Sequence, residues 1–235
     1  VLSLVTGLVG IYFLRQQGSL DTTNLFQLHQ RLFIGSYSFI VYLLKSVFPW
    51  EMSAVYPYPA KLTALFYLSM VPALAVAALP AIFFRKNRYL TFGLLFFIFN
   101  IVFMLQVVGA GQGFIADRFT YLPYLGLFLL FARGIEYLAT RYPRIRMVVV
   151  SLTAVGMMAL FATASRQVKV WENSKTLWTD VLSKQPKLAL AYNNLGLYYR
   201  QAGNPDEAIK NYNLAIRYDP SKGYVYNNRG KVYFE

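Results

Sequence analysis

The sequence predicts an all-α chain in two parts, a polytopic transmembrane helix bundle followed by an α-solenoid of short helical repeats. The chain is 57% hydrophobic and only 14% charged, whereas globular domains carry about 25% charged residues. Long uncharged stretches fill residues 1–165, and a repeating pattern occupies residues 166–235. We therefore expect a transmembrane domain over residues 1–165 and part of a repeat domain over residues 166–235.

The uncharged stretches have the length of membrane spans, which need about 20 mostly apolar residues. Four stretches qualify clearly: Leu62–Phe84, Tyr89–Ala116, Phe119–Leu138 and Met147–Ser165. Val1–Leu14 is interpreted as the end of a further span. Leu32–Trp50 contains Lys45, so it either crosses the membrane or lies in the interface as an amphipathic helix. Because the chain starts inside an apolar run without Met, we expect a fragment of a longer protein.

Two basic turns predict the orientation, since Lys and Arg in short loops favour the cytoplasmic side. The first turn is FRKNRY, Phe84–Tyr89. The second contains four arginines: Arg133, Arg141, Arg144 and Arg146. With both turns in the cytoplasm, the loops around Trp50–Lys61 and Gly109–Arg118 lie outside, as does everything after Ser165.

The last third of the chain repeats itself. Five pairs of like residues are 34 positions apart: Pro186 and Pro220, Tyr192 and Tyr226, Asn194 and Asn228, Gly196 and Gly230, and Tyr199 and Tyr233. A 34-residue period with this pattern is typical of tetratricopeptide repeats. Leu188–Pro220, LALAYNNLGLYYRQAGNPDEAIKNYNLAIRYDP, forms one unit, with Asn204 as the expected cap of its second helix. Residues 166–186 fit the second half of a preceding unit.

Two asparagine pairs recur in register and are candidates for a peptide-binding groove: Asn193, Asn194, Asn227 and Asn228. Side-chain amides both donate and accept hydrogen bonds, so they suit an extended peptide backbone. This predicts an acceptor protein or peptide as a partner of the repeats. The alternative is that these are surface asparagines retained for capping or solubility.

An ionic pair, Asp117–Arg118, lies at the predicted outer mouth of a span, in the stretch GFIADRFTYLPYLG. One interpretation is purely structural: Asp117 caps the following helix, Arg118 extends to the headgroups, and Tyr121 and Tyr124 belong to an interfacial aromatic belt. The other interpretation is that Asp117 and Arg118 form a functional pair.

Two segments and the repeats together resemble a known family. The segments are YLLKSVFPWEMSAVYPYP, Tyr42–Pro59, and ADRFTYLPYLGLFLLFARG, Ala116–Gly134. They are similar to GT-C type polytopic glycosyltransferases with a tetratricopeptide tail, which include bacterial members and the animal O-mannosyltransferases. The resemblance implies transfer of a sugar from a polyprenyl-phosphate donor to a protein hydroxyl on the extracytoplasmic face. The form ADRFTYLP is closer to bacterial members, which implies an inner membrane with periplasmic repeats, or an endoplasmic reticulum membrane with lumenal repeats in a eukaryote.

The resemblance also implies roles for individual residues. The catalytic carboxylate of the family lies in the first outer loop, so it is expected upstream of Val1 and is not assigned here. The full-length protein is the expected enzyme, and this fragment lacks the catalytic loop. The residues expected to bind the donor phosphate are Arg118, Lys45 and Lys61. Those expected to position the site are Asp117, which would hold Arg118, together with Tyr121, Tyr56 and Tyr58.

Other kinds of site have little support in the sequence. There is no Cys, and the single histidine, His29, has no acidic or histidine neighbour, so no cofactor is identifiable here, although the full-length protein could use a divalent metal. Nucleic acid is not an expected partner, because the basic clusters are turns beside spans in contact with the lipid bilayer. Two alternatives stay open: an O-antigen ligase or polymerase-like transferase, and a non-catalytic membrane-anchored repeat scaffold.

Overall fold

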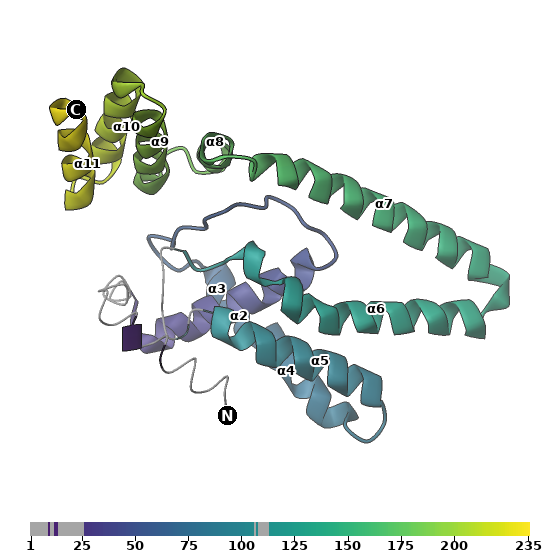
Figure 1. The fold of residues 1–235 in the computed structure, drawn as a ribbon. Coiled ribbons are helices and arrows are strands. Elements are labelled where there is room, and N and C mark those ends of the chain that lie inside the picture. Colours follow the sequence, from purple (N-terminus) through teal and green to yellow (C-terminus); the bar gives the residue numbers. More distant parts are fainter. Residues whose placement is uncertain (1–8, 10–11, 14–25, 106, 108–112) are drawn as a thin grey trace. The chain divides into compact units, whose positions relative to one another are not determined.

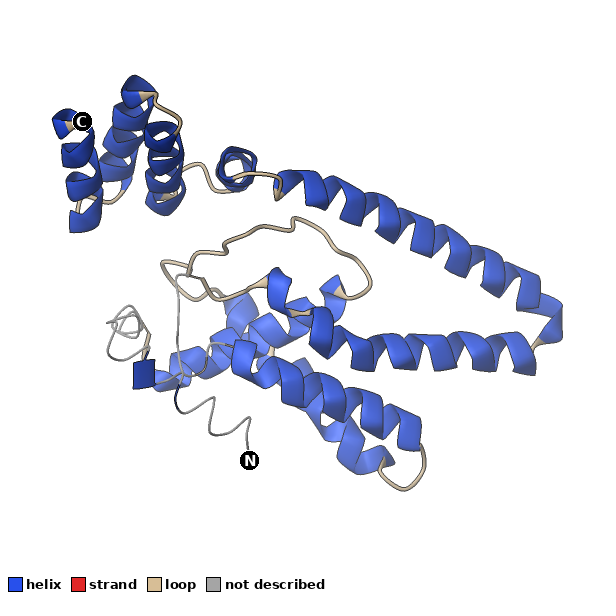
Figure 2. Cartoon of the chain, in the orientation of Figure 1, coloured by secondary structure: helices blue, strands red, loops and turns tan. Residues whose placement is uncertain are grey.

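The computed structural model describes residues 9, 12–13, 26–105, 107 and 113–235. Within these residues the chain is built from helices and connecting loops (Figure 2). It divides into two compact units, of which the first comprises Val1–Trp50 with Val55–Gly156, and the second Glu51–Ala54 with Met157–Glu235. Figure 1 labels the helices and colours them in sequence order, ending with α11 in yellow.

The first unit contains five α-helices among the described residues, and a sixth begins in it. They are α2 (Leu28–Lys45), α3 (Ala64–Leu68), α4 (Met70–Phe83), α5 (Arg88–Ile101), α6 (Tyr121–Arg141) and α7 (Arg146–Val170). In the described part of the chain, three helical stretches are long and apolar enough to cross a membrane: Ala64–Phe83, Tyr121–Arg141 and Pro143–Val170. The all-α fold class with apolar helices of spanning length is thereby confirmed.

The helix boundaries differ from the expected spans in two places. The predicted span Leu62–Phe84 is divided at Ser69 into α3 and α4. The predicted span Tyr89–Ala116 ends as a helix at Met104, so its apolar helical part is shorter than a span. Most of the predicted span Val1–Leu14 lies outside the described residues.

Two glycines allow α5 and α6 to cross closely. A Cβ atom on Gly93 would lie 2.7 Å from the carbonyl oxygen of Gly126, and one on Gly126 would overlap the carbonyl oxygen of Gly93. The surrounding core contains Phe97 and Ile101 of α5 and Tyr42 of α2, all fully buried. Glycine at both positions is therefore what brings the two helix backbones together.

Contacts at the two ends of this unit agree with the predicted two-sided arrangement of loops. Near one end the guanidinium of Arg133 lies 4.2 Å from the ring centre of Tyr89, which brings the two predicted cytoplasmic clusters together. At the other, Tyr56 and Ile115 form an isolated antiparallel bridge between the two predicted outer loops. Which end faces the cytoplasm stays a prediction.

The second unit contains the remainder of α7 and a stack of short helices: α8 (Ser174–Lys184), α9 (Ala189–Gln201), α10 (Pro205–Tyr218) and α11 (Gly223–Phe234). Asn204 caps α10 by accepting from the backbone of Glu207 at 3.2 Å, as expected. Gly196 faces the buried ring of Tyr212, and a Cβ atom there would lie 2.6 Å from that ring. This close approach of paired helices is the packing that the repeat pattern predicts.

Candidate functional site

The candidate site is centred on an ion pair between Lys45, the last residue of α2, and Asp117, which opens a short 3₁₀ turn before α6. The ammonium of Lys45 donates to both carboxylate oxygens of Asp117, at 2.9 and 3.2 Å. The two side chains are only 5% and 11% exposed. Charges so withdrawn from solvent require a partner, and here each is the partner of the other.

Tyr56 joins this pair as a third member. Its hydroxyl accepts from the ammonium of Lys45 at 2.5 Å and donates to the Oδ2 atom of Asp117. The ammonium also lies 4.4 Å from the centre of the Tyr56 ring. Three segments therefore meet in what we call the Lys45–Tyr56–Asp117 cluster: the end of α2, the loop after it, and the turn before α6.

The backbone around the cluster ties the two loops together. Phe114 donates its N–H to the carbonyl of Tyr56 at 3.0 Å, next to the Tyr56–Ile115 bridge. Gly113 allows this approach, because a Cβ atom there would lie 2.7 Å from the same carbonyl oxygen. The hydroxyl of Ser38 on α2 donates to the carbonyl of Phe114 at 3.2 Å.

Two further tyrosines hold the turn that carries Asp117. The hydroxyl of Tyr42 accepts from the backbone N–H of Ala116 at 2.7 Å. The hydroxyl of Tyr124, on α6, donates to the backbone carbonyl of Tyr42 at 2.9 Å. Asp117 is therefore placed by backbone contacts to α2, in addition to the bonds of its own carboxylate.

The structure brings together only some of the predicted site residues. Lys45, Tyr56 and Asp117 form the cluster. Tyr58 packs against the ring of Phe114, with ring centres 6.1 Å apart, and burial raises the pKa of its phenol, so it is neutral at ordinary pH.

The other predicted residues of this end are exposed. Arg118 follows Asp117 in the same turn, and its guanidinium lies 4.8 Å from the ring centre of Phe119. Lys61 is exposed in the loop before α3, and Tyr121, the first residue of α6, is 74% exposed. The predicted contacts of Arg118, Lys45 and Lys61 with a donor phosphate stay predictions.

The structural interpretation of Asp117 as a helix cap is wrong. Helix α6 begins at Tyr121, its N-cap residue is Thr120, and no side chain caps it. The carboxylate of Asp117 instead receives bonds from Lys45 and Tyr56, which belong to distant parts of the chain.

Three residues of the site were not predicted from the sequence: Ser38, Tyr42 and Tyr124. A signal for two of them exists, because Ser38, Tyr42 and Lys45 are spaced by four and three residues and share one face of α2. Buried polar groups aligned on one face of a helix indicate a polar partner on that side. In the structure this partner is the segment Phe114–Asp117.

The asparagines of the repeats bond partly to one another. The side-chain amide of Asn228 on α11 donates to the side-chain oxygen of Asn193 on α9 at 3.0 Å. Asn194 donates to the backbone carbonyl of Leu190 at 2.8 Å, within its own helix. Asn193 is buried and Asn227 is exposed. Recognition of a peptide by these amides stays a prediction.

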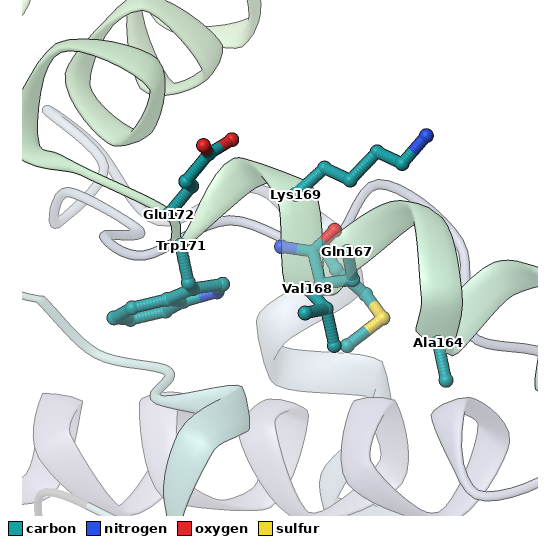
Figure 3. A pocket seen from close by; sticks show the side chains of 7 residues that line it. Ala164, Gln167, Val168, Lys169, Trp171 and Glu172 are labelled. Atoms are coloured by element: carbon teal, nitrogen blue, oxygen red, sulfur yellow. The ribbon is translucent and has the colours of Figure 1, made fainter.

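A hollow of about 630 Å³ lies in the second unit, where α7 ends. It is lined by Met52 and by residues at the end of α7 and just beyond it: Ala164, Gln167, Val168, Lys169, Trp171 and Glu172 (Figure 3). No sequence pattern predicted a role for it. Over the part of the chain that the structure describes, no three His, Cys, Asp or Glu side chains are grouped to hold a metal ion.

Comparisons with known proteins find similarity both in the repeats and in the preceding part of the chain. The family described as "Tetratricopeptide repeat" matches residues 177–210, and the family "TPR repeat" matches residues 196–235. The human protein O-mannosyl-transferase TMTC1 is 25% identical over 171 residues, which are 72% of this chain and 19% of the human protein. Its mouse counterpart is 25% identical over 167 residues, 70% of this chain and 18% of the mouse protein.

No solved structure matches the chain. The chain spans about a fifth of the length of the curated relatives that it matches. The repeat families match residues 177–235, which are too few to contain a match of 171 residues, so most of the residues matched to TMTC1 precede the repeats. The chain thus combines apolar helices of spanning length with tetratricopeptide repeats, and it is similar over most of its length to the TMTC1 O-mannosyl-transferases.

Proposed function

We propose that the full-length protein is an O-mannosyltransferase-like membrane glycosyltransferase, which moves a sugar from a polyprenyl-phosphate donor to a protein hydroxyl. The observation that carries this proposal is the similarity to TMTC1, because it runs through the apolar helices and is not confined to the repeats. Repeats alone would support only a protein-binding role, since they occur with many functions.

The Lys45–Tyr56–Asp117 cluster supports a role for the neighbouring Arg118 at the donor phosphate. When the sugar leaves, negative charge collects on the polyprenyl phosphate, and cations placed in advance stabilise it. Arg118 is exposed, always charged, and presents a planar fork that suits two phosphate oxygens at once. Lys61, also exposed, supplies a second positive charge on the loop before α3.

We assign no residue of this chain to activation of the acceptor hydroxyl, which requires a carboxylate, with a divalent metal if the full-length protein uses one. Residues 1–165 contribute the lipid-phosphate side of the reaction, and residues 166–235 contribute repeats that bind the acceptor protein or peptide.

The proposed orientation places the loops that carry Tyr56 and Asp117 on the extracytoplasmic face, together with the repeats. Two basic clusters favour the opposite, cytoplasmic side, and the contact between Arg133 and Tyr89 supports treating them as one side. In a bacterium this corresponds to the inner membrane with periplasmic repeats, and in a eukaryote to the endoplasmic reticulum with lumenal repeats.

The test is sugar transfer by the full-length protein in membranes, from polyprenyl-phosphate mannose to secreted proteins of the host. We expect Arg118→Ala to lower transfer by about a hundredfold or more, since a charge-stabilising donor of this kind contributes on that order. Arg133→Ala is the matched control, because Arg133 is also exposed but lies near Tyr89 and Glu136, away from the cluster; this variant should transfer normally.

Three results would contradict the proposal. Normal transfer by Arg118→Ala would remove Arg118 from the site. Transfer of a diphosphate-linked oligosaccharide in place of mannose would favour the ligase-like alternative. Absence of any transfer, with peptides still bound by the repeats, would favour the scaffold.

A further inference from the structure

Lys45 is a cation whose hydrogen bonds are directed into the protein. Its ammonium lies at 2.9 Å from Asp117 and at 2.5 Å from the hydroxyl of Tyr56, and its side chain is 5% exposed. Arg118, one residue beyond Asp117, is exposed. A group that binds the phosphate of a membrane lipid must be reachable from outside, which suits Arg118 and does not suit Lys45.

We propose that Lys45 is a positioning residue, which holds Asp117 and Tyr56 and thereby fixes the turn from which Arg118 projects. The sequence predicted Lys45 as a direct ligand of the donor phosphate, and this proposal replaces that role. It rests on the proposed function for the identity of the ligand, but the positioning itself concerns only contacts within the first unit.

The charge of Lys45 is what keeps the carboxylate of Asp117 inside. A buried carboxylate that loses its ion-pair partner is strongly unfavourable, so it must take up a proton or move toward solvent. Asp117 opens the 3₁₀ turn Asp117–Phe119, so its movement would carry Arg118 with it. Lys45 also ends α2, where a positive charge interacts favourably with the helix dipole.

Tyr56 extends the effect of Lys45 to the second loop. Its hydroxyl contacts both charged groups, while its backbone carbonyl accepts from Phe114, three residues before Asp117. The two loops are therefore linked twice, by a side chain and by a backbone bond. A buried ion pair used in this way specifies an arrangement, whatever it contributes to total stability.

Two backbone amides report whether this arrangement is intact. The N–H of Phe114 is bonded to Tyr56, and the N–H of Ala116 is bonded to the hydroxyl of Tyr42. Hydrogen exchange at these two amides therefore measures the opening of the loop pair. Retention of undecaprenyl phosphate by the full-length protein in phosphatidylcholine nanodiscs, followed by native mass spectrometry, measures binding of the lipid phosphate.

The expected results separate positioning from direct binding. Lys45→Met should raise exchange at both amides by about tenfold or more and lower retention by a similar factor, since loss of one partner of a buried pair is costly. Lys45→Arg keeps the charge, so its exchange rates and its lipid retention should lie between those of Lys45→Met and the wild type. Arg118→Ala should lose retention while exchange stays as in the wild type. Lys61→Met removes an exposed lysine and is the control for exchange.

Contrary results are equally distinct. Normal exchange with lost retention in Lys45→Met would make Lys45 a direct ligand and overturn the proposal. Normal exchange together with normal retention in Lys45→Met would also overturn the proposal, because Lys45 would then neither position the turn nor bind the lipid. If Lys45→Met does not fold, Tyr56→Phe removes only a hydroxyl, and normal exchange at Phe114 and Ala116 in that variant would contradict the proposal. If the wild type retains no undecaprenyl phosphate, the proposed function fails, and the exchange results still decide whether Lys45 positions the turn.

Discussion

The ammonium of Lys45 lies 2.9 Å from Oδ2 of Asp117, although 72 positions separate the two residues in the chain. Both side chains are almost inaccessible to solvent. The pair connects the end of α2 to the turn before α6, and thus joins two segments that are both expected at the outer mouth of the bundle.

This ion pair predicts that removing one of its charges lowers the free energy of unfolding more than removing both. Lys45→Met should lower the free energy of unfolding by about 3–5 kcal/mol, because it leaves Asp117 buried without its ion-pair partner. The double variant Lys45→Met with Asp117→Leu should cost less, because no charge is then left buried. Unfolding by SDS titration of the full-length protein in mixed micelles measures both values. If the double variant were as unstable as the sum of the two single variants, the two groups would not be coupled.

The glycine crossing of α5 and α6 gives a second prediction. Gly126→Ala should destabilise the protein by about 1–3 kcal/mol, because the added methyl overlaps the backbone of α5 and forces the helices apart. Gly134, also on α6, has open space where a Cβ would be placed, so Gly134→Ala should be neutral or should stabilise by up to about 1 kcal/mol. Thermal unfolding of the two variants side by side checks the difference, and equal melting temperatures would contradict the observed crossing.

The repeats contain a similar pair of glycines, Gly196 and Gly230, at equivalent positions 34 residues apart. At Gly196 a Cβ would lie 2.6 Å from the ring of Tyr212, whereas at Gly230 it would meet open space. Since Tyr212 is fully buried, its ring has little room to move. We expect Gly196→Ala to lower the free energy of unfolding by about 1–3 kcal/mol. In the chain of residues 1–235, Gly230→Ala should leave it unchanged, because a Cβ there meets no atom of the described residues within 4 Å. Circular dichroism of each variant of this chain during heating distinguishes them; an equal fall in melting temperature for both variants would be inconsistent with the packing.

Much of the fold follows from the sequence because its signals are local. The length of uncharged stretches predicts helices of spanning length: Phe119–Leu138 was expected and Tyr121–Arg141 is observed. The 34-residue period predicts the repeats, and the pattern Asn204-Pro205 predicts the start of α10. In each of these cases, the residues whose pattern predicts the helix are the residues that form it.

The site was only partly predictable because its contacts are not local. Asp117 and Arg118 are adjacent, which suggested a local ionic pair, yet the carboxylate of Asp117 bonds to Lys45 and Tyr56. Lys45 is placed by the packing of α2, and the Tyr56–Ile115 bridge joins two irregular loops. Neither loop has a hydrophobic period that would specify its register.

The proposed orientation can be tested by fusions of alkaline phosphatase, which is active only outside the cytoplasm, in a bacterial host. A fusion after Arg88 lies in the first basic turn and should be inactive. A fusion after Pro186, beyond α8, should be active, because Lys and Arg in short loops favour the cytoplasm. Activity after Arg88 and none after Pro186 would invert the topology, and would place Arg118 on the wrong face for an extracytoplasmic donor.

The last prediction concerns the different roles of Asp117 and Arg118: Arg118 is proposed to bind the donor phosphate, and Asp117 to hold the turn through its ion pair with Lys45. Arg118→Lys keeps the positive charge but loses the planar fork, so sugar transfer should fall by about tenfold or more without loss of membrane-inserted protein. Asp117→Asn keeps the shape of the side chain but removes the charge that pairs with Lys45. An uncompensated ammonium is then left at the cluster, so transfer should fall and the protein should also be less stable.

The two variants therefore differ in stability and not only in activity. Transfer from polyprenyl-phosphate mannose, measured beside the melting temperature of each variant, separates them: Arg118→Lys should melt as the wild type does, and Asp117→Asn should melt earlier. Wild-type transfer by both variants would mean that the pair is only an interfacial feature of the bundle. An early melting temperature for Arg118→Lys would instead place Arg118 among the structural contacts of the turn, where the loss of transfer would follow from unfolding.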